Sequence, residues 1–75
     1  MKFSVLISVY KNDIPEYFNQ AVNSILNQTL IPNEVVLVRD GSVGLELNRE
    51  IQSFINNKIV KVKYIELNNN VGLGL

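Results

Sequence analysis

The residues best suited to hold a ligand are Asp40, Gly41 and Ser42, which come directly after the apolar run at 35–38. That run is rich in β-branched residues and apolar on both alternating faces, which is typical of a parallel strand covered by helices on both sides. Open α/β sheets bind ligands at the carboxyl ends of their strands, so the Asp40 carboxylate is a candidate ligand contact. Asp40 could instead close an Asx-type turn with the amide of Gly41 or Ser42.

The composition excludes several kinds of chemistry. There is no cysteine, which removes disulfides, thiolate metal sites and a cysteine nucleophile, and no histidine, the commonest general base. The formal net charge is zero and only Lys58, Lys61 and Lys63 form a local cluster, so nothing indicates nucleic-acid binding. The apolar opening at 3–9 is too short to span a membrane, which predicts a cytoplasmic protein.

The order of elements predicts an α/β fold. β-rich runs at 3–9, 34–39 and 59–67 alternate with helical periodicity at 15–27 and 45–56. This alternation is typical of βαβ units around a parallel sheet.

Each predicted helix carries an apolar stripe that should face the sheet. Asp13 and Glu16 have the spacing of a capping box around Pro15, which favours a helix start at that point. The expected core positions on the two helices are Phe18, Ala21, Val22, Ile25, Leu26, Leu47, Ile51, Phe54 and Ile55.

Right-handed crossovers place the three strands in the order 3-2-1, as in a three-layer, Rossmann-like βαβαβ half-fold. The sequence closes on an apolar, glycine-containing stretch at 71–75 without a further element. We therefore expect residues 1–75 to form a single, truncated domain. The open edge of its first strand predicts self-association.

The three strand ends should form the rim of one nucleotide-sized crevice, made by Val9, Tyr10, Asp40 and the segment 68–72. Uracil presents an imide N–H between two carbonyls, so Asp40 could accept from it while backbone groups of Val9 meet the ring edge. Tyr10 could stack on the base or pack on the first helix.

The glycines near these strand ends are Gly41, Gly44, Gly72 and Gly74. Each could allow close backbone approach to a ligand, or could serve a turn or a helix end.

Two common nucleotide-binding patterns are missing. The loop at 10–15 has no glycine where a dinucleotide pyrophosphate would approach a helix, and its separation from Asp40 exceeds the usual spacing of about 20 residues. No glycine-rich loop ends in Lys-Ser or Lys-Thr, so a P-loop is also absent.

Segments 7–13, 21–29 and 34–42 resemble the start of a family-2 glycosyltransferase, which has the GT-A fold. The resemblance runs through nearly the whole chain. It implies that Val9 and Tyr10 line the nucleotide base and that Asp40 accepts from it, with Gly41 in the following turn. Asn70 and Gly72 match a family turn near the donor.

Two departures from the family pattern, Arg39 and Lys11, limit how far these roles can be assigned to this chain. Arg39 replaces the Asp, Asn or Glu that usually precedes the Asp-Gly-Ser turn, and could face a phosphate or be solvated. Lys11 replaces an asparagine common after the tyrosine. Asp13 could cap the helix or contact the ligand.

The resemblance implies sugar transfer from a nucleotide-diphospho-sugar, with a UDP-sugar favoured, to a hydroxyl of a saccharide or glycolipid acceptor. A divalent cation, Mg or Mn, is expected for the complete enzyme, but the family's metal motif and catalytic base lie later in the chain. We therefore assign no catalytic or metal residue here and expect nucleotide binding without turnover. The family often acts at the inner membrane face, so peripheral membrane contact is a further expectation.

Two alternatives remain open: a noncatalytic nucleotide-binding remnant of the same fold and, less favoured, a fragment of a dinucleotide-dependent oxidoreductase.

Overall fold

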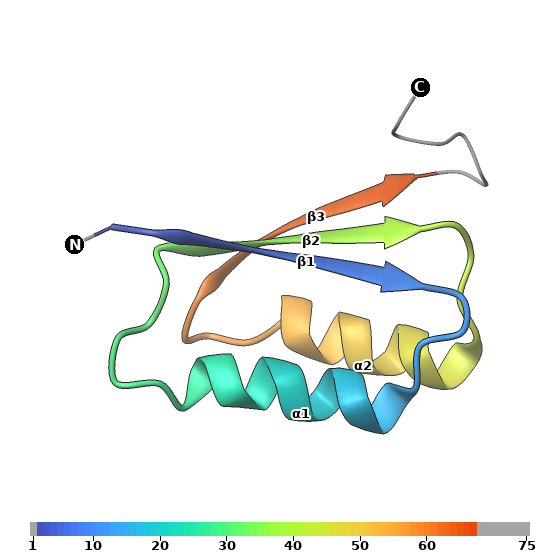
Figure 1. The fold of residues 1–75 in the computed structure, drawn as a ribbon, viewed down its shortest axis with the longest axis horizontal. Helices are drawn as coiled ribbons and strands as arrows, with labels where there is room; N and C mark the ends of the chain where they lie inside the picture. Colours follow the sequence, from blue (N-terminus) through green and yellow to red (C-terminus); the bar gives the residue numbers. More distant parts are fainter. Residues whose placement is uncertain (1, 68–75) are drawn as a thin grey trace.

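The fold is a βαβαβ unit with a fully parallel sheet (Figure 1). The structure is a computed structural model that describes residues 2–67. Its strands lie in the order β1-β2-β3, so the predicted order is confirmed. The elements are β1 (Ser4–Tyr10), α1 (Pro15–Leu26), β2 (Glu34–Asp40), α2 (Leu45–Ile55) and β3 (Lys61–Leu67).

Both helices cover the same face of the sheet (Figure 1). This follows from two right-handed crossovers that step across the sheet in one direction. Residues 2–67 thus supply two of the three expected layers. On β2, Val35 and Leu37 are fully buried beneath the helices, whereas Val36 and Val38 on the other face are only partly buried. The expectation that helices cover both sides of β2 is therefore not met within this part of the chain.

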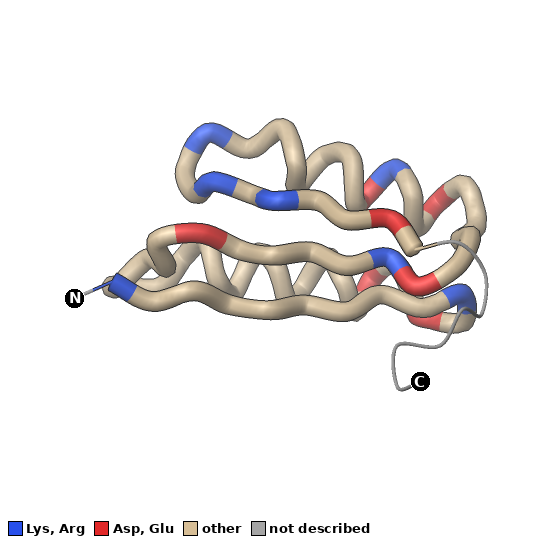
Figure 2. Tube along the Cα trace, turned by 90° about the horizontal axis from the view of Figure 1, so that it is seen from above, with Lys and Arg blue, Asp and Glu red and all other residues tan. Residues whose placement is uncertain are grey.

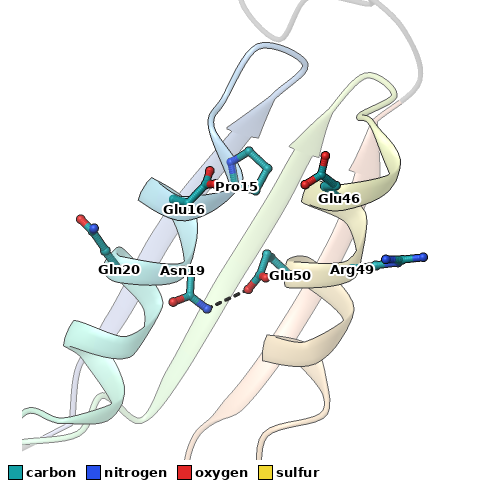
Figure 3. A pocket seen from close by; sticks show the side chains of 7 residues that line it. All are labelled: Pro15, Glu16, Asn19, Gln20, Glu46, Arg49 and Glu50. Atoms are coloured by element: carbon teal, nitrogen blue, oxygen red, sulfur yellow. Dashed lines mark hydrogen bonds between the residues drawn. The ribbon is translucent and has the colours of Figure 1, made fainter.

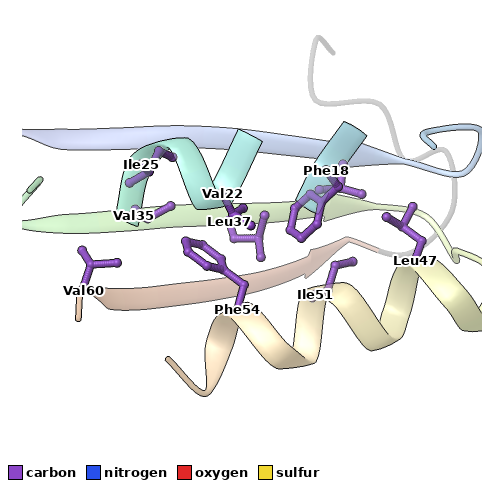
Figure 4. Close-up of a cluster of buried hydrophobic side chains, with 10 residues drawn as sticks. Phe18, Val22, Ile25, Val35, Leu37, Leu47, Ile51, Phe54 and Val60 are labelled. Carbon is purple, nitrogen blue, oxygen red and sulfur yellow. The ribbon is translucent and has the colours of Figure 1, made fainter. Parts of the chain in front are cut away.

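The core lies between the sheet and the two helices (Figure 4). Phe18 from α1 and Phe54 from α2 meet edge to face, with ring centroids 6.3 Å apart. The predicted stripes are confirmed except at Ala21, which is exposed. The buried hydrophobic residues that form the core are Val9, Phe18, Val22, Ile25, Val35, Leu37, Leu47, Ile51, Phe54 and Val60.

The start of α1 differs from the prediction. Pro15 is the first helical residue, as expected, but the N-cap is Ile14 and no side chain caps the helix. The predicted capping box is wrong because the Asp13 carboxylate instead accepts a hydrogen bond from the backbone N–H of Tyr10.

The turn from α2 into β3 is built around Asn57. Its side-chain oxygen accepts hydrogen bonds from the N–H groups of Ile59 and Val60, and its side-chain amide donates to the carbonyl of Phe54. This turn delays β3 to Lys61, two residues later than predicted, and it directs Val60 into the core. Neither helix of the described chain is long and apolar enough to cross a membrane.

Candidate functional site

The strand register brings the two main predicted ligand contacts together. Tyr10, Asp40 and Leu67 are in-register partners at the carboxyl ends of β1, β2 and β3. Neighbouring strands lie about 4.8 Å apart, and in-register residues of parallel strands project on the same face. The side chains of Tyr10 and Asp40 therefore emerge side by side on the face opposite the helices.

Asp40 is a free acceptor within residues 2–67. Its carboxylate is partly buried and takes no hydrogen bond from any side chain or backbone N–H of this part of the chain. The Gly41 amide donates to the carbonyl of Leu67 instead, at 3.0 Å. The alternative of an Asx-type turn is therefore not formed within residues 2–67.

Gly41 makes the turn after β2 possible. Its φ of +86° lies in the left-handed region that side-chain-bearing residues rarely adopt. In this conformation its amide extends the pairing between β2 and β3 by one hydrogen bond beyond Asp40. The residue therefore fixes how the strand ends meet at the site.

Tyr10 presents its ring at the end of β1. The residue is 50% exposed and does not belong to the hydrophobic core, contrary to the alternative that it packs on α1. Val9 is only 1% exposed, and its side chain projects toward the helices. Of the predicted base-lining pair, only Tyr10 offers an accessible side chain.

Arg39 points away from Asp40, into the helix-facing side of the sheet. Its in-register partner on β3 is Glu66, and Arg39 Nη1 lies 3.5 Å from Glu66 Oε2. The Arg39 side chain is only 19% exposed, so the prediction that it is solvated at the strand end is wrong.

Tyr64 completes this polar cluster beneath the sheet. Its hydroxyl and the Arg39 Nε are both buried without a hydrogen-bond partner. Burial raises the pKa of the Tyr64 hydroxyl above 10.0, and Glu66 adds to this rise while the charge of Arg39 opposes it. The cluster links β2 to β3 and lies on the opposite face from Asp40.

An open groove of about 460 Å³, which was not predicted, lies between the helices (Figure 3). Asn19 donates a hydrogen bond to Glu50 across it, with an Nδ2–Oε1 distance of 2.7 Å. Sequence motifs give no signal for such a groove because it depends on how two helices sit together. Its lining residues are Pro15, Glu16, Asn19, Gln20, Glu46, Arg49 and Glu50.

Charge is distributed unevenly along the strands (Figure 2). Lys58, Lys61 and Lys63 lie just before and at the start of β3, whereas Arg39, Asp40 and Glu66 lie at the carboxyl ends of β2 and β3. Residues 2–67 hold no group of three Asp, Glu, His or Cys side chains that could bind a metal ion. The predicted contacts Asn70 and Gly72, like Gly74, lie outside the described residues, and Gly44 is the N-cap of α2.

Comparison with known proteins identifies the family of this chain. Residues 4–75 match the sequence profile of glycosyl transferase family 2. The chain belongs to this family, which confirms the resemblance that the segments around Tyr10 and Asp40 indicated.

Three curated relatives are all named glycosyltransferases. A UDP-Gal:alpha-D-GlcNAc-diphosphoundecaprenol beta-1,3-galactosyltransferase from Escherichia coli is 41% identical over 73 residues, covering 97% of this chain and 26% of the relative. The amylovoran biosynthesis glycosyltransferase AmsE from Erwinia amylovora is 39% identical, covering 96% and 26%. An uncharacterized glycosyltransferase from Haemophilus influenzae is 36% identical, covering 99% and 27%.

The chain therefore spans about a quarter of the length of the curated relatives it matches. No solved structure matches it significantly.

Proposed function

We propose that this chain is the nucleotide-binding part of a glycosyltransferase that moves a sugar from a nucleotide-diphospho-sugar to an acceptor hydroxyl. The observation that carries the proposal is the in-register pair formed by Tyr10 and Asp40 at adjacent strand ends. One supplies an accessible aromatic face, and the other a carboxylate without a partner in residues 2–67. This is the end of an open α/β sheet where ligands bind.

The pair suits a uracil base. The Asp40 carboxylate would accept the imide N–H, a charge-assisted bond of the stronger kind, and the Tyr10 ring would stack on or flank the base. Backbone groups of Val9 would meet the edge of the base, and the absence of a side chain at Gly41 would let the ligand approach the backbone. Asn70 and Gly72 are further proposed donor contacts, because they match a turn that the family places near the donor.

The relatives support a particular class of donor and acceptor. The Escherichia coli relative is named for UDP-Gal and for a diphosphoundecaprenol-linked acceptor. We propose that this protein likewise uses a UDP-sugar as donor and a saccharide or glycolipid as acceptor. A cytoplasmic enzyme in peripheral contact with the inner membrane face would have access to both substrates.

Members of this family generally depend on a divalent metal, so Mg or Mn is expected in the complete enzyme. Residues 2–67 offer no grouped ligands for it, so we assign these residues no step that involves the metal. Their role is to bind and orient the nucleotide. We expect the 75-residue chain to bind nucleotide without transferring sugar.

The exposed edge of β1 supports self-association of the isolated chain. The strand Ser4–Tyr10 contains no charged residue, whereas β3 carries Lys61, Lys63 and Glu66. Charged side chains protect sheet edges from pairing with another chain, so β1 is the edge expected to pair. Ser8→Lys should therefore reduce association measured by light scattering; unchanged association would contradict this role of β1.

The test of the site is an amide-resolved NMR titration of the chain with uridine diphosphate in the presence of magnesium. Shifts centred on Tyr10, Asp40 and Gly41 are expected, and Asp40→Ala should weaken binding about tenfold or more, since hydrogen bonds to charged groups contribute about 1.5–3 kcal/mol. Glu46→Ala removes one carboxylate from α2 and is the matched control. Unchanged affinity in folded Asp40→Ala would refute the assignment.

Two further measurements separate the alternatives. Sugar transfer by the chain would contradict its proposed inactivity, whereas a lack of transfer by the complete protein would favour a noncatalytic nucleotide-binding module. Tighter binding of a nicotinamide dinucleotide than of uridine diphosphate would favour an oxidoreductase fragment. The loop between β1 and α1 lacks the glycines that such a dinucleotide requires.

A further inference from the structure

Asp13 is joined to Tyr10 by two hydrogen bonds. The Asp13 carboxylate Oδ2 accepts from the Tyr10 backbone N–H at 2.9 Å. In the other direction, the Asp13 N–H donates to the Tyr10 carbonyl oxygen at 3.1 Å. Both backbone polar groups of Tyr10 are thus engaged by one residue three positions later.

This arrangement restrains the end of β1. β1 is an outer strand of the described sheet, and the last residue of an outer strand has few partners that could order it. Asp13 supplies the donor and the acceptor that a neighbouring strand would otherwise provide. The side chain of Tyr10 remains exposed, and the restrained backbone sets the direction of its Cα–Cβ bond, from which the ring projects.

Helix capping, ion pairing and core packing do not account for Asp13 within residues 2–67. The N-cap of α1 is Ile14, without a side-chain capping bond. The one ion pair of residues 2–67 joins Arg39 to Glu66 and does not involve Asp13. Asp13 is also exposed, so it adds nothing to the core.

We propose that Asp13 is a positioning residue, which holds the Tyr10 ring beside Asp40 so that both can meet one nucleobase. This inference rests on the proposed function, because it assigns Tyr10 to the base. It adds a residue that acts through Tyr10 and does not itself touch the nucleotide.

Three substitutions separate a positioning effect from an effect of charge. Asp13→Ala removes both the acceptor and the charge, whereas Asp13→Asn keeps an acceptor oxygen without the charge. Glu16→Ala is the control, because it removes the charge of a nearby exposed residue that makes no hydrogen bond in residues 2–67. Asp13→Leu is a second variant without an acceptor, of similar size to Asn, in case Asp13→Ala does not fold.

The readouts are the dissociation constant for uridine diphosphate and the hydrogen-exchange rate of the Tyr10 amide. Asp13→Ala and Asp13→Leu should raise the dissociation constant about tenfold and speed exchange at Tyr10, as expected for loss of a hydrogen bond to a charged group. Asp13→Asn should stay within about threefold of the wild type, since it can still accept, and Glu16→Ala should match the wild type.

Equal loss of affinity in Asp13→Ala and Asp13→Asn would overturn the proposal, because charge would then explain the effect. Unchanged affinity together with faster Tyr10 exchange would also overturn it. If the wild-type chain binds no uridine diphosphate, the proposed function fails, but hydrogen exchange still tests the hydrogen bond between the Tyr10 N–H and the Asp13 carboxylate. Faster Tyr10 exchange in Asp13→Ala then supports the restraint, and equal exchange in the two proteins rejects it.

Discussion

Arg39 and Asp40, adjacent in sequence, serve opposite faces of the sheet. Arg39 is paired with Glu66 on the helix-facing side, while Asp40 emerges beside Tyr10 on the other side. The alternation of a β-strand makes this separation unavoidable. The replacement of an acidic or amide residue by arginine before the Asp-Gly-Ser turn therefore leaves the proposed base contact unobstructed.

The first prediction concerns the two halves of this ion pair. Glu66→Ala leaves a mostly buried guanidinium without its counterion and should lower the free energy of unfolding by about 1 kcal/mol, a modest value because Glu66 is half exposed. Arg39→Met should cost less, since it removes the charge together with the unpaired Nε, and the remaining carboxylate stays hydrated.

Urea unfolding of the two variants and the wild type measures this difference. A larger loss in Arg39→Met than in Glu66→Ala would mean that the arginine stabilises the fold through contacts other than the pair.

The second prediction concerns stability at alkaline pH. Burial raises the pKa of Tyr64 in the folded state, so folding favours its neutral hydroxyl. This contribution is fully present below pH 10.0, the unfolded value, and is lost as the pH rises through the raised folded pKa. Wild-type stability should therefore fall more steeply above pH 10 than that of Tyr64→Phe.

At neutral pH, Tyr64→Phe removes a buried hydroxyl that has no partner, so the free energy of unfolding should stay equal or rise by up to about 1 kcal/mol. Tyr17→Phe is the control substitution, because the Tyr17 side chain is 65% exposed. A parallel pH dependence of Tyr64→Phe and the wild type would contradict the prediction.

The third prediction compares one substitution at two glycines. An added Cβ meets no atom within 4 Å at Gly41 or Gly44, so backbone conformation alone distinguishes them. Gly41→Ser places a side chain at φ +86° and should lower the free energy of unfolding by about 1–2 kcal/mol. Gly44→Ser, at φ −69° in the N-cap of α2, should be neutral or stabilising because serine is a preferred N-cap.

Thermal unfolding of the two serine variants checks this contrast. Equal melting temperatures would show that the turn after β2 relaxes into another conformation.

The features predicted from sequence are those that depend on periodicity. The stripes at Phe18, Val22 and Ile51 and the parallel strand order follow from spacing and crossover handedness, which act locally. The roles of Asp13 and Arg39 depend on the path of a loop and on the register of β3, which short-range patterns do not fix. Asp13 has the spacing of a capping box, but its carboxylate accepts a hydrogen bond from the backbone N–H of Tyr10 and does not cap the helix.

The fourth prediction concerns the turn that sets the start of β3. Asn57→Ala removes two acceptor contacts and one donor contact and should lower the free energy of unfolding by about 1–2 kcal/mol. Asn57→Asp keeps the acceptors for Ile59 and Val60 and should recover part of the loss.

Asn56→Ala is the matched control, since the Asn56 side chain makes no hydrogen bond in residues 2–67 and the effect of its removal should be small. Denaturant unfolding measures all three variants, and an Asn57→Ala protein as stable as Asn56→Ala would show that core packing of Val60 alone positions β3.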